Sequence, residues 1–163
     1  MVLTHFIPLA FFKWCETTLI GHAIRQATWG FAVIETFHIM TLAVFLGTIV
    51  VIDLRLLGFG LRRRSASKLA SELAPWNWTA LVLMLLTGIP LFLSEATRLS
   101  GSTPFFIKMM FFLLGLLIQV TIFRKATRDE GWLGRLTGIL SLICWFGVAF
   151  AGRAIAFPEL FHL

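Results

Sequence analysis

Residues 31–52 read FAVIETFHIMTLAVFLGTIVVI, and this stretch decides the class of the protein. It is longer than the about 20 helical residues that cross the roughly 30 Å hydrocarbon core of a bilayer. Only Glu35 and His38 interrupt it with ionisable side chains, and Asp53 and Arg55 follow its end. The stretch therefore predicts a transmembrane helix that carries polar groups near its beginning.

Three further apolar stretches of similar length lie at 76–94, 104–123 and 132–152. The chain has 163 residues, about one domain, and is 58% hydrophobic and 13% charged. A soluble domain has roughly 45–50% apolar and about 25% charged residues, so this chain has too little polar surface for a water-soluble globule. We predict an all-α integral membrane four-helix bundle over residues 31–157.

Residues 1–30 are expected to form an N-terminal interfacial segment. Val2 to Phe12 are apolar, but no basic residue precedes them and no small-x-small cleavage site follows, so a secretory signal is not expected. Trp14 to Trp29 mix polar and apolar positions, which predicts an amphipathic helix on the membrane surface, with Gly30 as a hinge.

The connections are predicted as follows. A short helix over Ser65 to Ala74 ends at Pro75, because a proline disfavours helical geometry in the residue before it. Residues 95–103 are predicted as a loop and residues 124–130 as a charged turn.

Basic residues predict the orientation. The loops after the first and third spans hold eight, whereas the other side holds three, Lys13, Arg25 and Arg98. By the positive-inside rule, the eight lie in the cytoplasm and both termini are periplasmic in a bacterial inner membrane. The net charge of +6 is thus explained without nucleic acid. The eight are Arg62, Arg63, Arg64, Lys68, Arg124, Lys125, Arg128 and Arg135.

An ionisable residue at membrane depth is costly and indicates a functional site. Five such residues fall in the predicted outer leaflet, and every span contributes at least one: Glu35, His38, Glu95, Lys108 and Arg153. At about 100° per residue, Asp53 points in the same direction as Glu35, and His38 within about 60° of it. Asp53 is expected to accept hydrogen bonds at the helix end. One stripe of the third span carries Lys108, Phe112, Gly115 and Gln119.

Glu35 and His38 have two interpretations. The imidazole can bind a metal or heme b with the carboxylate as its orienting partner, or the two can form a hydrogen-bonded pair between helices. A second heme ligand would be His22, if the chain folds back at Gly30, or a residue of a second protomer in a homodimer. The terminal His5 and His162 are expected to be solvated.

Lys108 and Arg153 also have two interpretations. They are interfacial anchors, or they bind an anionic or carbonyl group such as a heme propionate, a quinone or a lipid phosphate. The sequence shows no nucleophile–base pair and no phosphate-binding loop, so we expect no independent catalytic activity.

The chain resembles a family of small four-span bacterial inner-membrane proteins of unknown function, from Thr18 to Phe157. The resemblance rests on E-x-x-H and D-L-R-L-L-G in the first span, then on P-W, L-L-T-G, F-x-I-K, S-L-x-x-W and G-R-x-I-A. Here these are Glu35 to His38, Asp53 to Gly58, Pro75–Trp76, Leu85 to Gly88, Phe105 to Lys108, Ser141 to Trp145 and Gly152 to Ala156. His22 is not part of the pattern. The likeness implies a fold and no reaction.

A more distant likeness to cytochrome b561-type and copper-resistance membrane proteins concerns the fold alone.

Three functions follow as hypotheses. The first is a redox-associated module or accessory subunit that binds heme, quinone or a metal. The second is a cofactor-free scaffold that associates with other subunits of a membrane complex. The third is a transporter of copper or another metal ion, for which Asp53 and Gln119 hint at a polar path that few soft ligands line.

Overall fold

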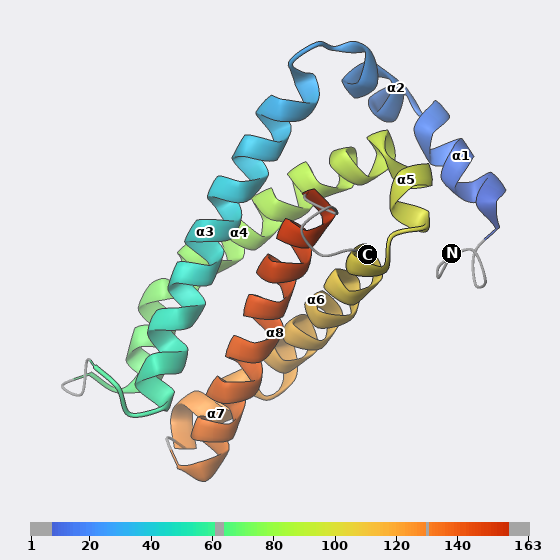
Figure 1. Ribbon diagram of the computed structural model, residues 1–163. Helices are drawn as coiled ribbons and strands as arrows, with labels where there is room; N and C mark the ends of the chain where they lie inside the picture. Colours follow the sequence, from blue (N-terminus) through green and yellow to red (C-terminus); the bar gives the residue numbers. More distant parts are fainter. Residues whose placement is uncertain (1–7, 61–63, 130, 157–163) are drawn as a thin grey trace.

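The computed structural model describes residues 8–60, 64–129 and 131–156, and this part of the chain is built from helices (Figure 1). His5 and His162, and the ends of the predicted segments 1–30 and 31–157, lie outside it. In chain order the helices are α1 (Leu9–Thr17), α2 (Leu19–Gln26), α3 (Gly30–Leu56), α4 (Ala66–Ser94), α5 (Ala96–Ser100), α6 (Thr103–Thr121), α7 (Phe123–Asp129) and α8 (Trp132–Ala156).

Four helices, α3, α4, α6 and α8, are long and apolar enough to cross a membrane. They coincide with the four predicted spans and confirm the all-α membrane bundle. Helix α3 packs on α4 and α8, and α8 packs on α6, so α8 lies between α3 and α6 (Figure 1). Helices α1, α2 and α5 gather at one end of the bundle, here called the α1 end, and α7 lies at the opposite α7 end.

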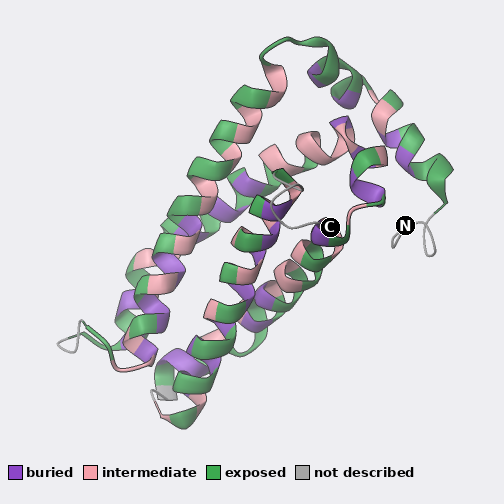
Figure 2. Ribbon diagram, viewed as in Figure 1, coloured by how far each residue is buried: buried purple, intermediate pink, exposed green. Residues whose placement is uncertain are grey.

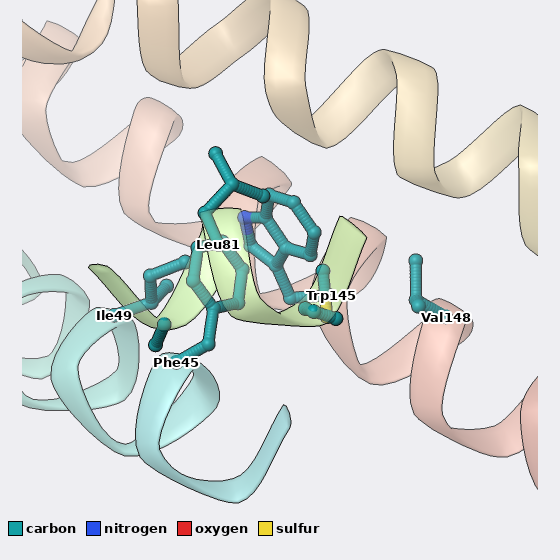
Figure 3. Packing of buried hydrophobic residues seen from close by; sticks show 7 residues of the cluster. Phe45, Ile49, Leu81, Trp145 and Val148 are labelled. Atoms are coloured by element: carbon teal, nitrogen blue, oxygen red, sulfur yellow. The ribbon is translucent and has the colours of Figure 1, made fainter. Parts of the chain in front are cut away.

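The centre of the bundle is apolar and aromatic (Figure 3). Phe45 meets the Trp145 indole edge to face, with ring centroids 4.5 Å apart, and Phe112 meets it at 5.9 Å. A Cβ added at Gly115 would lie 3.0 Å from the indole, so glycine lets Trp145 lie against α6. The cluster joins three spans through Phe45, Ile49, Ala80, Leu81, Met84, Trp145 and Val148.

Large apolar side chains also cover the outside of the bundle (Figure 2). Less than a third of the most apolar window of each span is buried within the chain. Leu86, Leu117 and Phe150 are among the most exposed. A surface of this kind is stable against lipid tails and would be unstable in water.

Pro75 does not end a helix, so the prediction of a separate helix over 65–74 was wrong. Helix α4 continues through both Pro75 and Pro90. Each proline removes one backbone hydrogen bond. The packing of α4 on both sides of Pro75 outweighs that loss, since Leu69 is buried before the proline and Asn77 after it.

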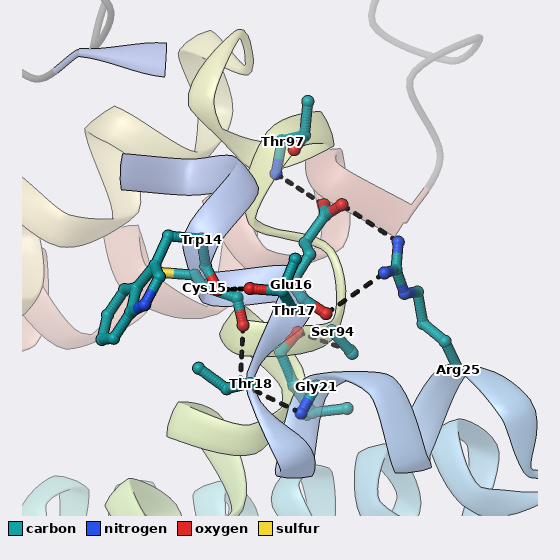
Figure 4. Close-up of polar contacts among 10 residues, drawn as sticks. Trp14, Cys15, Glu16, Thr17, Thr18, Gly21, Arg25, Ser94 and Thr97 are labelled. Atoms are coloured by element: carbon teal, nitrogen blue, oxygen red, sulfur yellow. Dashed lines mark hydrogen bonds and ion pairs between the residues drawn. The ribbon is translucent and has the colours of Figure 1, made fainter. Parts of the chain in front are cut away.

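The expected single amphipathic helix is two helices, because Thr18 adopts an extended backbone between α1 and α2. The Thr18 hydroxyl caps α2 by accepting a hydrogen bond from the Gly21 amide. Glu16 then joins three short helices (Figure 4): its carboxylate accepts from the Thr97 amide at 2.8 Å and pairs with Arg25 at 3.0 Å. Thr97 belongs to α5, which occupies the predicted loop 95–103, just as α7 occupies the predicted turn 124–130.

Candidate functional site

His38 lies on α3 and points at α4, where its Nδ1 is 2.9 Å from the Thr87 hydroxyl oxygen. The Thr87 hydroxyl donates its single hydrogen to a backbone carbonyl of its own helix, that of Leu83 at 2.8 Å or of Met84 at 3.2 Å. A hydroxyl that donates to one of these carbonyls accepts from His38, and this arrangement places the ring hydrogen on Nδ1. The lone pair of Nε2 is then available to a metal, or to a hydroxyl or N–H donor.

Gly88 explains how the ring reaches this position. A Cβ at Gly88 would lie 3.0 Å from the Cε1 atom of His38, closer than such contacts normally allow. The glycine lets the imidazole lie directly on α4, beside the threonine that orients it. The L-L-T-G stretch thus supplies both the hydrogen-bond partner of the histidine and the space for it.

Lys108 on α6 adds a positive charge to this group. The half-buried ammonium interacts electrostatically with the Glu35 carboxylate and with His38. It also lies against α8, because a Cβ at Gly152 would be 3.9 Å from its Nζ atom. Segments of all four spans therefore meet here. We call Glu35, His38, Thr87 and Lys108 the His38 group.

The two other predicted site residues, Glu95 and Arg153, are not part of the His38 group. Glu95 follows the last residue of α4, where its carboxylate pairs with Arg98 on α5. Arg153 is exposed on α8, next in sequence to the Gly152 that faces Lys108. Of the five residues expected to form the site, the structure thus brings together Glu35, His38 and Lys108.

The residues around His38 offer one imidazole. His22 is exposed on α2, where its ring contacts the Gln26 amide at 3.3 Å. Within the described ranges, no group of three His, Cys, Asp or Glu side chains gathers as a multi-ligand metal site requires. An acceptor nitrogen, an ammonium and a carboxylate can instead bind a ligand that carries a carbonyl and an ionisable hydroxyl.

A second polar group lies nearer the α7 end. The buried Asn77 donates from its Nδ2 to the Thr48 hydroxyl at 2.9 Å and accepts from the Gln119 Nε2. The three side chains come from α4, α3 and α6, and we call them the Asn77 group. Sequence analysis identified Gln119 on an inward stripe but missed Thr48, Asn77 and Thr87. Asn77 stands between two tryptophans at a span end, so its sequence context resembles that of an interfacial residue.

Asp53 lies where α3 packs against α8. It is fully buried, and neither of its carboxylate oxygens accepts a hydrogen bond from a described residue. The Ser141 hydroxyl of α8 lies beside it, and Gly138 brings α8 against its backbone carbonyl. Asp53 thus lies in the last turn of α3 with the Ser141 hydroxyl as its neighbouring donor, so its role as a hydrogen-bond acceptor at the helix end stays a prediction.

The fold and the polar groups define a multi-pass helical membrane protein. Residues 11–158 match the family described as a family of unknown function, DUF6644, and the chain belongs to this family. No curated protein and no solved structure matches the chain.

Proposed function

We propose that the protein is a redox-associated membrane module that binds a lipid-soluble quinone at the His38 group. The observation that carries the proposal is the position of His38, whose Nδ1 lies 2.9 Å from the Thr87 hydroxyl oxygen while Lys108 interacts electrostatically with both His38 and Glu35. With the ring hydrogen on Nδ1, Nε2 is the acceptor. An imidazole and a carboxylate from α3 and an ammonium from α6 can then bind the same ligand.

The three side chains have complementary roles in this proposal. The Lys108 ammonium donates to a quinone carbonyl, and a charge-assisted bond of this kind is strong at a site with little water. The Nε2 of His38 accepts a hydrogen bond from the hydroxyl of the reduced form. The Glu35 carboxylate holds a proton or offsets the charge of Lys108. Electrons come from a partner redox subunit, so the module acts as an accessory subunit.

Heme b and copper fit these residues less well. If heme b were bound, His38 would ligate its iron, and Lys108 and Arg153 would pair with its propionates. Copper would have His38 and Glu35, without the soft sulfur ligands that favour this metal. A redox spectrum distinguishes these alternatives from quinone.

The orientation belongs to the same proposal. The α7 end carries most of the basic residues that flank spans, such as Arg124 and Lys125, and Trp76 and Trp132 are exposed near it. By the positive-inside rule this end faces the cytoplasm of a bacterial inner membrane. The His38 group then lies in the outer leaflet, and the N-terminus and the C-terminus are periplasmic.

The test is the binding of decylubiquinone to protein purified in detergent, followed by tryptophan fluorescence, after a spectrum of the oxidised and reduced protein. Lys108→Met and His38→Ala are each expected to weaken binding at least tenfold, since a lost bond to a charged group is worth about 1.5–3 kcal/mol. Lys125→Met on α7 and His22→Ala on α2 are the matched controls and leave binding unchanged.

Two results would overturn the proposal. A reducible Soret band that His38→Ala abolishes would identify heme b instead of quinone. Equal affinity in all variants, with no absorption band and no bound metal, would favour the scaffold function, which co-purification of partner subunits would then identify.

A further inference from the structure

A cavity of about 320 Å³ lies between α3, α4, α6 and α7, at the α7 end of the bundle. Its volume is at the lower end of the range of small-molecule sites, about 300–1,000 Å³. The cavity is separate from the His38 group, because none of the residues that line it belongs to that group.

The mouth of the cavity is basic. Arg124 and Arg128 line it and stand one turn apart on α7, so their guanidinium groups project from the same face. The described residues that line the cavity include no acidic side chain. The nearby Glu72 of α4 is engaged by Arg64, at 2.6 Å. Two cations without a carboxylate between them favour an anionic ligand.

The lining of the cavity is mostly apolar, and Asn77 and Gln119 add polar groups to it. Gln119 donates from its Nε2 to Asn77. Its Oε1 is buried and accepts no hydrogen bond from the described part of the chain. A buried acceptor without a donor costs about 1–3 kcal/mol. A small rotation of the Gln119 side chain toward the cavity would let a ligand that carries a hydroxyl or ammonium group supply the missing donor.

The depth of the cavity matches that of lipid headgroups. Trp78 lines it, and Trp76 and Trp132 are exposed near the same end. Tryptophan side chains concentrate at the membrane–water interface. Basic pockets between spanning helices at this depth are suited to anionic headgroups.

We infer that this cavity binds a phosphate ester that also carries a hydroxyl or ammonium donor, as the headgroup of an anionic glycerophospholipid does. Arg124 and Arg128 bind the phosphate oxygens, and the Oε1 of Gln119 accepts from the donor of the headgroup. A soluble phosphate ester such as glycerol 3-phosphate has the same chemistry. The inference is independent of the quinone site.

Thermal unfolding in dodecyl maltoside tests the inference with three probes: short-chain phosphatidylglycerol, phosphatidylcholine with the same chains, and glycerol 3-phosphate. Phosphatidylglycerol is expected to stabilise the protein. Phosphatidylcholine is expected to leave the stability unchanged, because its headgroup has no hydroxyl or N–H donor. If glycerol 3-phosphate stabilises the protein and phosphatidylglycerol does not, the cavity binds a phosphate ester, and its ligand is a soluble one. No stabilisation by either phosphate ester would overturn the inference.

Variants separate a built site from general attraction of charges. Arg124→Gln/Arg128→Gln is expected to weaken the response to the active probe at least tenfold in concentration. Lys125→Gln/Arg135→Gln removes the same charge from the same end without touching the cavity, and is expected to respond like the unmodified protein. Ser67→Leu narrows the mouth without changing the charge and should also weaken binding. Equal losses in the two double variants would contradict the inference.

Discussion

The His38 group and the Asn77 group are built from the same three helices and differ in kind. Helix α3 gives His38 to one and Thr48 to the other, and α4 gives Thr87 and Asn77. Helix α6 likewise contributes Lys108 to the first group and Gln119 to the second. Each of these pairs is 10 or 11 residues apart in sequence, or about 15 Å along a helix.

Between the two groups lies a layer of three aromatic side chains and one methionine, one residue from each span, here called the aromatic layer: Phe45, Met84, Phe112 and Trp145. The His38 group, on one side of the layer, has three ionisable side chains, whereas the Asn77 group, on the other side, has two neutral amides and a hydroxyl. The buried Asp53 also lies on this second side, outside the Asn77 group. A neutral hydrogen-bonded group joins helices at little cost in the membrane. Ionisable groups are costly at this depth and indicate a site. The comparison teaches that equally spaced positions on the same helices carry ionisable side chains in one half of the bundle and neutral, hydrogen-bonded side chains in the other.

The largest expected effect comes from removing the layer itself. Trp145→Ala deletes a side chain that is 1% exposed and contacts both Phe45 and Phe112. We expect a loss of about 3–5 kcal/mol in the free energy of unfolding. Denaturant titration in detergent measures it, with Trp132→Ala, which removes an exposed indole, as the control. Comparable losses in the two variants would mean that the layer does not stabilise the bundle.

The next effect concerns the Asn77 group. Asn77→Leu removes the bonds to Thr48 and Gln119, and we expect the free energy of unfolding to fall by about 1–2 kcal/mol. Quinone affinity should stay unchanged, because the aromatic layer lies between. Thr79→Val, an exposed position of the same helix, is the control for unfolding. A loss of quinone affinity in Asn77→Leu would contradict the separation of the two groups by the layer.

A smaller effect is expected at Thr87, which positions His38. Thr87→Val keeps the shape and removes the hydrogen bond, at a cost of about 0.6 kcal/mol in stability. The ring hydrogen of His38 should then distribute between Nδ1 and Nε2, which ¹⁵N chemical shifts report directly. Thr41→Val is the control, since the Thr41 hydroxyl bonds the backbone carbonyl of His38 and not its ring. An unchanged tautomer in Thr87→Val would remove the threonine from the site.

The smallest effect is expected at Glu95, which sequence analysis placed in the site. Glu95→Gln breaks an ion pair with the exposed Arg98, and such pairs contribute about 0–1 kcal/mol. Quinone binding should not change, and Arg98→Gln should behave in the same way. If Glu95→Gln alone weakens binding as much as Lys108→Met, Glu95 belongs to the His38 group after all.

Much of the bundle could be predicted because the bilayer imposes strong and simple constraints. Each of the four spans was recognised from its length and apolar composition. On α6, the 3.6-residue period correctly placed Lys108, Phe112, Gly115 and Gln119 on one inward stripe. The continuity of α4 through Pro75 could not be predicted, because local preference at a proline opposes it and only packing on both sides decides the outcome.

Sequence alone determined that this chain is a helical membrane protein, which faces bear polar groups, and that Glu35, His38 and Lys108 need an explanation. These results follow from hydrophobicity and helical periodicity, which are properties of single segments. The tertiary structure decided which polar residues meet: Thr87 with His38, and Asn77 with both Thr48 and Gln119. Such pairs depend on the order and rotation of neighbouring helices, and the hydrophobicity and periodicity of a single segment do not determine either.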